Sequence, residues 1–175
     1  MTSNTCIDVP ESDAGVCPFC DYLAGRRPYA IVAMSSSVGI LVTQEVRGKP
    51  HLLVVPSRHC ETILDLTDQE AAEVLVAVRD VARAIDSAYC RPGIAVWQNN
   101  GRSADQAIGH VHFHIAGTLD EGGTEWGPVP EVSLSEAEWV ADELRPYWRE
   151  QGTHDPPRDA PLRSPSGLAP RGVGG

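Results

Sequence analysis

Three histidines alternate with apolar residues in the short stretch His110–Ala116. Because successive side chains of an extended strand point to opposite faces, His110, His112 and His114 would share one face of a strand. The chain contains 6 histidines, so half of them lie in this stretch. Neutral imidazole is both a nucleophile and a metal ligand near neutral pH, and the tract therefore predicts nucleophilic chemistry or a metal site.

The spacing of this tract favours a nucleophile over a metal ion bound by all three rings. Residues two apart on a strand have Cα atoms about 6.6 Å apart, so reaching one ion with three imidazoles would strain the geometry. Using the middle histidine, His112, as a nucleophile between its neighbours is less demanding. A three-histidine zinc site with an open position is the alternative that the residues alone leave open.

The loop just before the tract, residues 99–106, is rich in amide and hydroxyl groups. Side-chain and backbone N–H groups of such a loop can bind phosphate oxygens, although clusters of this composition also mark ordinary polar turns. Because this loop leads directly into the histidines, we favour the phosphate-binding interpretation.

Cys17 and Cys20 form a C-x-x-C pair. Such a pair is a redox motif, half of a zinc site, or a coincidence. A redox pair usually begins a helix after a strand, and no strand pattern precedes this one. A tetrahedral zinc would need two further ligands, and since no second C-x-x-C follows, the histidines are the available source.

Composition narrows the class of protein. The 175 residues carry a formal net charge of −10, which argues against a nucleic-acid partner because phosphate binding needs a basic face. No apolar run approaches the ~20 residues of a membrane-spanning helix, and residues 1–16 lack the apolar segment of a secretory signal. We therefore expect a cytoplasmic protein without a membrane partner and, with 5 cysteines in a reducing compartment, no disulfide framework.

The chain divides into three parts by composition. Residues 1–15 predict a flexible leader, and residues 16–150 predict a single folded domain. Residues 151–175 are rich in proline and glycine and poor in apolar residues, which predicts a disordered tail.

Hydrophobic periodicity predicts the elements of the domain. Four strands are expected, at 38–43, 51–55, 93–98 and 110–116. Thr67 and Glu70 form a capping-box pattern, and the apolar three- and four-residue steps behind them predict a long helix over 68–89. A short helix over 135–144 opens with Ser135. These elements predict an α+β fold, an antiparallel meander sheet packed on one long helix plus a short C-terminal helix.

At these residues the chain resembles the histidine triad (HIT) family, whose motif is His-φ-His-φ-His-φ-φ with φ apolar. Residues 110–116 match every position of that motif. The spacings that the family shows upstream of the triad are matched by Asn99, Gly101, Ala104 and Gln106. Residues 54–59 resemble the family's strand that ends in proline and is followed by a histidine. The resemblance covers about residues 16–119 and implies a HIT-like fold.

The resemblance also implies an activity: hydrolysis or nucleotidyl transfer at the α-phosphate of a nucleoside monophosphate conjugate, through a covalent nucleotidyl-histidine. The conjugate would be a phosphoramidate, an acyl-adenylate or a dinucleoside polyphosphate. The catalytic residues carried over are His112 as nucleophile, with His110 and His114. The substrate-binding residues carried over are Asn99, Gln106 and His51, with Thr43 at the ribose. No catalytic cofactor is required.

A metal site is implied by the same resemblance, because many bacterial members hold a structural zinc through an N-terminal C-x-x-C. The ligands carried over to this chain are Cys17, Cys20, His59 and His110. A Cys₂His₂ set closes a tetrahedron with no open position, as a structural zinc does, and one Zn²⁺ per chain is expected. His110 would then anchor the metal, and His112 would react.

Some positions depart from the family pattern. Thr43 stands where an aspartate commonly contacts the ribose, and Ala107 stands where a serine is frequent. Residues 121–132, with Trp126, resemble the C-terminal extension of the Hint-like branch. That branch is dimeric, so the resemblance implies a homodimer. The departures leave a second hypothesis open, a nucleotide-binding or zinc-binding interaction protein with little turnover.

Overall fold

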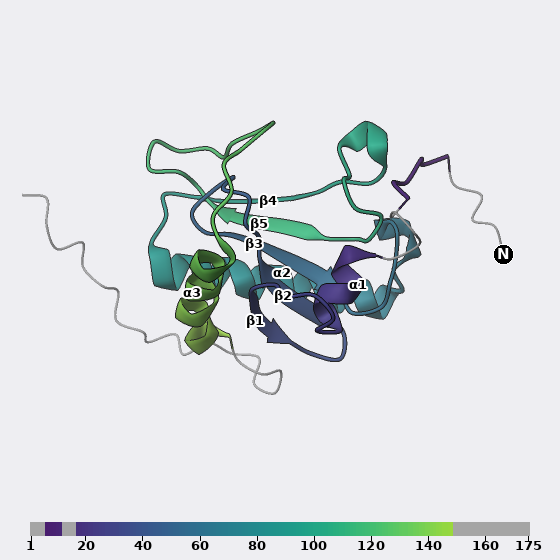
Figure 1. Ribbon diagram of the computed structural model, residues 1–175, viewed down its shortest axis with the longest axis horizontal. Helices are drawn as coiled ribbons and strands as arrows, with labels where there is room; N and C mark the ends of the chain where they lie inside the picture. The colour runs from purple at the N-terminus through teal and green to yellow at the C-terminus, as the bar shows by residue number, and fades with distance from the viewer. Residues whose placement is uncertain (1–5, 12–16, 149–175) are drawn as a thin grey trace, which may run out of the picture.

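The computed structural model describes residues 6–11 and 17–148 (Figure 1). The predicted tail at 151–175 lies outside these residues, as do residues 1–5 and 12–15 of the predicted leader. The helices are α1 (Pro18–Leu23), α2 (Asp68–Tyr89) and α3 (Leu134–Leu144), with short 3₁₀ turns at Ile63–Asp65, Arg102–Ala104 and Arg145–Tyr147. The strands are β1 (Ile31–Met34), β2 (Val38–Val42), β3 (His51–Pro56), β4 (Ile94–Gln98) and β5 (Phe113–Gly117).

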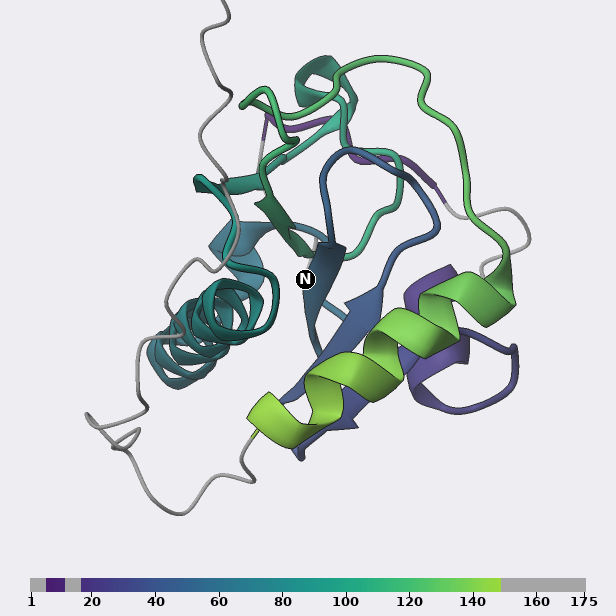
Figure 2. The same cartoon turned by 90° about the vertical axis from the view of Figure 1, so that its left-hand side faces the viewer.

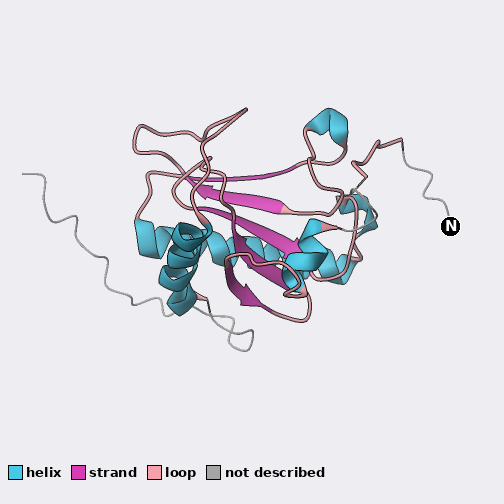
Figure 3. Cartoon of the chain, in the orientation of Figure 1, coloured by secondary structure: helices cyan, strands magenta, loops and turns pink. Residues whose placement is uncertain are grey.

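The five strands form one sheet in the order β1-β2-β3-β5-β4, and every neighbouring pair is antiparallel (Figure 3). The α+β class is therefore confirmed. The strand order departs from a simple meander at one point, because α2 follows β3 and the chain then enters the sheet at its far edge as β4. β5 returns between β4 and β3, which places the histidine tract beside β3.

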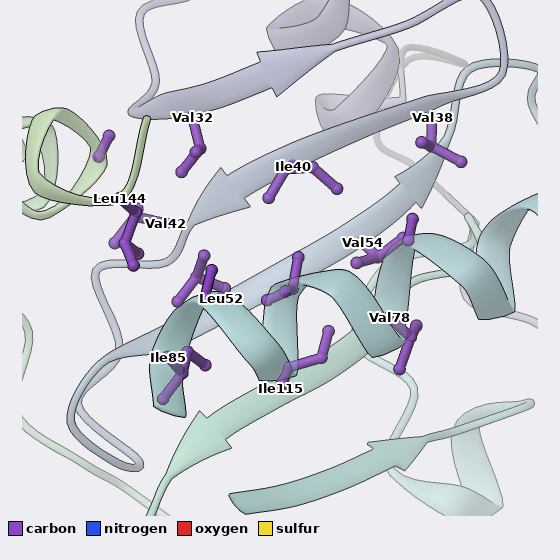
Figure 4. Packing of buried hydrophobic residues seen from close by; sticks show 14 of the residues in the cluster. Val32, Val38, Ile40, Val42, Leu52, Val54, Val78, Ile85, Ile115 and Leu144 are labelled. Carbon is purple, nitrogen blue, oxygen red and sulfur yellow. The ribbon is translucent and has the colours of Figure 1, made fainter. Parts of the chain in front are cut away.

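The main core lies between one face of the sheet and the two longer helices (Figure 4). Val54 and Ile115 from the sheet pack there with Val78 and Ile85 of α2 and Leu144 of α3 (Figure 4). α2 covers the sheet on one side of this face and α3 crosses it at the other (Figure 2). The remaining residues of each strand, which alternate with these, face the opposite side of the sheet.

That opposite face carries a smaller cluster in which α1 packs against the sheet. Phe19 of α1 is 2% exposed and lies with Leu41, Leu53 and Val55. Alternation along β3 thus divides the strand between two layers, with Leu52 and Val54 toward α2 and Leu53 and Val55 toward α1.

The helix ends follow the capping chemistry of the sequence. The side chain of Thr67 accepts from the backbone N–H of Glu70, and α2 runs over the predicted range. At α3 the capping pair is Ser133 and Glu136, two residues before the predicted Ser135. None of the helices in the described residues combines the length and the apolar character that crossing a membrane requires.

Candidate active site and metal site

The regular strand of the histidine tract begins at Phe113, so the prediction of a strand from His110 was three residues too early. The reason lies in β3, which ends at Pro56, a residue without an N–H for the ladder. Beyond that point the backbone N–H of Val111 bonds instead to the carbonyl of Cys60, at 2.7 Å. The three histidines nevertheless stay on the face of α1, since His110 and His112 both contact the ring of Phe19.

His112 is held in one tautomer by the main chain. Its side chain is buried, and its Nδ1 lies 2.7 Å from the carbonyl oxygen of His110. A carbonyl oxygen only accepts hydrogen bonds, so Nδ1 carries the proton and Nε2 keeps its lone pair. Burial lowers the pKa of His112, which keeps the ring neutral and that lone pair available near neutral pH.

His51 and His114 form a hydrogen-bonded pair beside His112. Nδ1 of His51 lies 3.0 Å from the carbonyl oxygen of Glu45, and Nε2 of His51 lies 3.0 Å from Nδ1 of His114. The carbonyl fixes the proton on Nδ1 of His51, so Nε2 accepts and His114 donates. Burial lowers the pKa of His51 to about 4 and that of His114 to about 2, so both rings are neutral at pH 7.

The ring of His114 leans toward His112 and so joins the pair to the candidate nucleophile. The centroids of the two rings are 4.9 Å apart at an interplanar angle of 65°. Because Nδ1 of His114 donates to His51, its lone pair is on Nε2, as it is in His112. The site thus contains two neighbouring imidazoles with unprotonated Nε2 atoms.

A cluster of sulfur and imidazole atoms lies at the other end of the tract. It contains Cys17, Cys20, His59 and His110, and the possible ligand atoms of these residues all lie within 4.8 Å of one another. Sγ of Cys17 is 3.2 Å from Nδ1 of His110, and Sγ of Cys20 is 3.5 Å from Nδ1 of His59. Tetrahedral zinc with ordinary Zn–S and Zn–N lengths separates such S and N atoms by about 3.6 Å. The four side chains predicted from the sequence therefore lie together in a group that fits a metal ion.

The surroundings of the cluster also suit a metal. Nε2 of His110 lies 3.0 Å from the carbonyl oxygen of Pro56, which fixes the proton on Nε2 and leaves Nδ1 free to bind. Burial and the neighbouring Cys17 raise the pKa of Cys20 to about 11, and a dication would favour the thiolate instead. Cys60, beside His59 in sequence, points elsewhere and donates to the carbonyl of Arg58 at 3.5 Å.

The loop before the tract is held together by Gln106, which is 3% exposed. Its Oε1 accepts from the N–H of Gly101 at 2.6 Å, and its Nε2 donates to the carbonyls of Glu61 and Ile108 at 2.7 and 3.0 Å. The side chain of Asn99 donates to the carbonyl of Ala104. Both amides thus shape the loop, and their contact with a phosphate stays a prediction.

An N-terminal segment packs on this loop (Figure 1). Residues 6–11 belong to the predicted leader, and the carbonyl of Asp8 accepts from the N–H of Arg102 at 2.8 Å. A Cβ on Gly101 would lie 2.6 Å from Cγ2 of Ile7, and one on Gly109 would lie 2.4 Å from the carbonyl oxygen of Pro10. The two glycines therefore make room for residues 6–11. Such a contact has no local signal in the sequence, because it joins positions about a hundred residues apart.

The remaining predicted positions lie around this centre. Thr43 follows β2, its backbone N–H bonds to the carbonyl of His51 at 3.2 Å, and its hydroxyl accepts from the N–H of Glu45 at 3.3 Å. Ala107 is exposed in the loop. Trp126 is 68% exposed and its ring lies 5.7 Å from that of Trp97.

Trp97 is a residue of the site that sequence reasoning missed. It lies on β4 directly opposite His114 of β5. The two rings are stacked, with centroids 4.7 Å apart and an interplanar angle of 1°. Trp97 is two residues before Asn99, but its neighbour across the sheet becomes known only once β4 and β5 are paired in register.

The region that contains these site residues also resembles known proteins. Residues 25–120 match the HIT domain family. Protein hit from Bacillus subtilis is 34% identical over 113 residues, which are 63% of this chain and 78% of that protein. The adenosine 5'-monophosphoramidase of Schizosaccharomyces pombe is 31% identical over 131 residues, which are 73% of this chain and 95% of that enzyme.

Solved structures agree in fold. A hypothetical histidine triad nucleotide-binding protein from Sulfolobus tokodaii superposes with a TM-score of 0.67 at 26% identity, over 75% of this chain and 91% of that one. A zinc-bound histidine triad family protein from Mycobacterium smegmatis has the same fold, with a TM-score of 0.65 at 20% identity over 75% of this chain and 91% of that one. The family match over 25–120, the relatives and the shared fold show that the chain belongs to the histidine triad (HIT) family.

Proposed function

We propose that this protein is a hydrolase or nucleotidyltransferase that acts at the α-phosphate of a nucleoside monophosphate conjugate. The observation that carries the proposal is the hydrogen bond from Nδ1 of His112 to the carbonyl of His110, at 2.7 Å in a buried site. This contact leaves Nε2 of a neutral imidazole as a nucleophile.

The reaction proceeds in two displacements at phosphorus. Nε2 of His112 forms a bond to the α-phosphorus while the bond to the leaving group breaks, and the leaving group takes the electron pair and, where it is an amine, a proton from solvent water. Water, or another acceptor, then attacks the same phosphorus and releases its proton to solvent, while the bond between phosphorus and Nε2 of His112 breaks. Dividing the reaction in this way replaces one difficult step with two easier ones. The proton on Nδ1 stays hydrogen-bonded to the carbonyl while positive charge develops on the ring.

Phosphoramidates are the substrate class that we favour. The support is the likeness to enzymes named adenosine 5'-monophosphoramidase, from Schizosaccharomyces pombe at 31% identity and from Candida albicans at 27% identity. Acyl-adenylates and dinucleoside polyphosphates present the same α-phosphate with other leaving groups. Thr43 would meet the ribose with a hydroxyl instead of a carboxylate, which reduces the number of hydrogen bonds that it can accept.

We propose that the cysteine–histidine cluster holds one structural Zn²⁺ per chain. The support is the Cys₂His₂ donor set, the S to N distances of 3.2 to 3.6 Å and the fixed tautomer of His110. The metal would tie α1 to the segments that carry His59 and His110, and its binding energy would stabilise the fold. It leaves His112 free for the reaction.

We also propose that the protein is a homodimer, as the Hint-like resemblance implies, and that it is cytoplasmic. β4 is an edge strand with Val96 49% exposed, and Leu75 of α2 is 64% exposed. Sedimentation of the purified chain would measure the oligomeric state, and a single monomeric species at micromolar concentration would contradict the dimer.

The test of the activity is incubation with adenosine 5'-phosphoramidate, with AMP release measured and intact mass recorded after an acid-free quench. We expect AMP and a transient adduct of one nucleotide, and neither with His112→Ala. Binding of the nucleotide without release or adduct in the folded, metal-loaded wild type would instead support a nucleotide-binding protein with little turnover.

A further inference from the structure

Trp97 covers both members of the His51–His114 pair. Its indole stacks on His114 at 4.7 Å with an angle of 1°, and on His51 at 5.3 Å with an angle of 28°. The two imidazoles lie edge to edge, with ring centroids 5.2 Å apart at an angle of 27°, and are joined by the hydrogen bond of 3.0 Å. Three aromatic rings thus form one packed unit, in which the indole contacts the two rings that the hydrogen bond connects.

The backbone fixes where this indole lies. Trp97 and His114 are direct cross-strand partners in an antiparallel pair, so their side chains leave the sheet on the same face. Stacked aromatic pairs at this separation contribute beyond simple burial, and a flat contact restricts rotation of the imidazole about its χ2 torsion. The sheet register therefore supplies a support for the ring plane of His114.

A second aromatic ring, that of Trp126, also contacts Trp97. The ring of Trp126 is 5.7 Å from that of Trp97 at an angle of 48°. Arg47 fastens the loop that carries Trp126, because its Nη1 donates to the carbonyl of Gly127 at 3.1 Å and its carbonyl accepts from the N–H of Glu125. Nε of Arg47 also donates to the Glu45 carboxylate at 2.7 Å.

Glu45 therefore links this loop to His51. Its carboxylate holds Arg47, and its backbone carbonyl accepts from Nδ1 of His51 at 3.0 Å. A change in the plane of either imidazole would have to displace Trp97, whose ring also contacts that of Trp126.

We infer that Trp97 is a positioning residue for His114: the stacked indole fixes the imidazole plane, keeps Nδ1–H directed at His51, and thereby aims the Nε2 lone pair of His114 beside Nε2 of His112. The inference deepens the proposed function, on which its catalytic part rests. Nothing in the triad motif names this position, and the role follows from the β4–β5 register and the ring geometry.

The test compares Trp97→Leu, which fills space without an aromatic face, with the conservative Trp97→Phe. Trp139→Phe is the matched control, because Trp139 is 59% exposed on α3 and belongs to no part of the site. The readouts are the ring ¹⁵N chemical shifts of His114, which report its tautomer, and kcat and KM for adenosine 5'-phosphoramidate.

In the wild type and in Trp97→Phe we expect a single Nδ1–H tautomer of His114. In Trp97→Leu we expect mixed tautomers and a fall in kcat of roughly 10- to 100-fold with KM within about threefold, since small displacements of a reacting group cost this much. Trp139→Phe should match the wild type in both readouts. A His114 tautomer and a kcat unchanged in folded Trp97→Leu would overturn the inference.

The two readouts separate this inference from the proposed function. If the wild type releases no AMP but Trp97→Leu still loses the single tautomer, the proposed activity fails while the support of His114 by Trp97 stands. If Trp97→Leu is active and Trp97→Phe also shows mixed tautomers with full kcat, the positioning role is wrong even though the enzyme works. Should Trp97→Leu fail to fold, Trp97→Met removes the aromatic face with a more flexible side chain, and the inference then requires mixed tautomers and a lower kcat in Trp97→Met but a single tautomer in Trp97→Phe.

Discussion

His110 and His112, the first two histidines of the tract, use the same side chain in opposite tautomers. His110 meets a carbonyl through Nε2 and turns Nδ1 toward two sulfur atoms, whereas His112 meets a carbonyl through Nδ1 and keeps the lone pair on Nε2. Residues two apart in one segment thus have opposite ring nitrogens available, which suits the two roles proposed for them, metal ligand for His110 and nucleophile for His112. The difference teaches that the backbone acceptor beside each ring, more than the motif itself, decides which nitrogen is available.

The largest expected effect is the loss of turnover without loss of metal. His112→Ala should lower kcat by more than about a thousandfold, because removing a nucleophile removes the covalent route. Zinc content and Tm should stay close to those of the wild type, since His112 is not in the ligand cluster. Steady-state rates and metal analysis on the same sample check both parts. Loss of the zinc together with the activity would contradict the separation of His112 from the metal cluster.

The opposite result is expected for Cys17→Ser, which should remove the metal. The free energy of unfolding should fall by about 3 kcal/mol or more, because a structural zinc contributes folding energy. For a domain of this size that corresponds to a fall in Tm of about 10 °C. Cys90→Ser is the matched control, as Cys90 is exposed and outside the cluster. Full zinc and an unchanged melting curve in Cys17→Ser would show that the cluster is no metal site.

Acid should weaken the fold through the His51–His114 pair. The pKa of His51 is lowered from 6.5 to about 4 in the folded protein, so between these values the unfolded chain binds more protons and the free energy of unfolding falls as pH falls. The stability is fully present above about pH 6.5, and roughly 3 kcal/mol of it is lost by pH 4 through His51 alone. Urea titrations at pH 7, 5.5 and 4 measure this loss.

A variant identifies the source of that dependence. His51→Gln removes one titrating ring, so its stability should change less with pH than that of the wild type under the same metal conditions. Equal slopes in the two proteins would show that the acid sensitivity does not come from His51.

The smallest effect concerns residues 6–11. Deleting residues 1–11 removes the hydrogen bond from Arg102 to Asp8 and uncovers Gly101 and Gly109, so kcat/KM should fall by roughly threefold to tenfold through a looser loop, with zinc content unchanged. Asp8→Ala keeps the main-chain bond and removes an exposed ion pair at 3.6 Å, so it should behave nearly as wild type. Equal losses in both variants would assign the effect to charge.

Much of the fold was predictable where local signals agreed. α2 has the predicted bounds because a capping box and a regular apolar period mark the same segment. β1 was missed because it is a four-residue edge strand whose burial does not alternate cleanly. The strand of the tract was set too early, since the proline that ends β3 acts on a partner far away in sequence.

In the site, too, some features were predictable from the sequence and others depended on contacts between distant segments. The four candidate metal ligands, Cys17, Cys20, His59 and His110, were predicted together from the resemblance, and the structure brings them together. The hydrogen bond from His114 to His51 and the stacking of Trp97 depend on the registers of β3 and β4 with β5, which no single segment encodes. The loop contacts of Gln106 likewise required the tertiary structure.

Position 110 serves the protein through two separate groups, an imidazole side chain for the cysteine cluster and a main-chain carbonyl for His112. Only the first of these depends on the identity of the residue. A cysteine at this position would still bind a metal and would leave the carbonyl where it is, whereas no other side chain supplies the ring of His112. Replacing the first histidine of the triad with another metal ligand would therefore leave the chemistry proposed for His112 in place, whereas replacing the second would remove it, even though both side chains are buried.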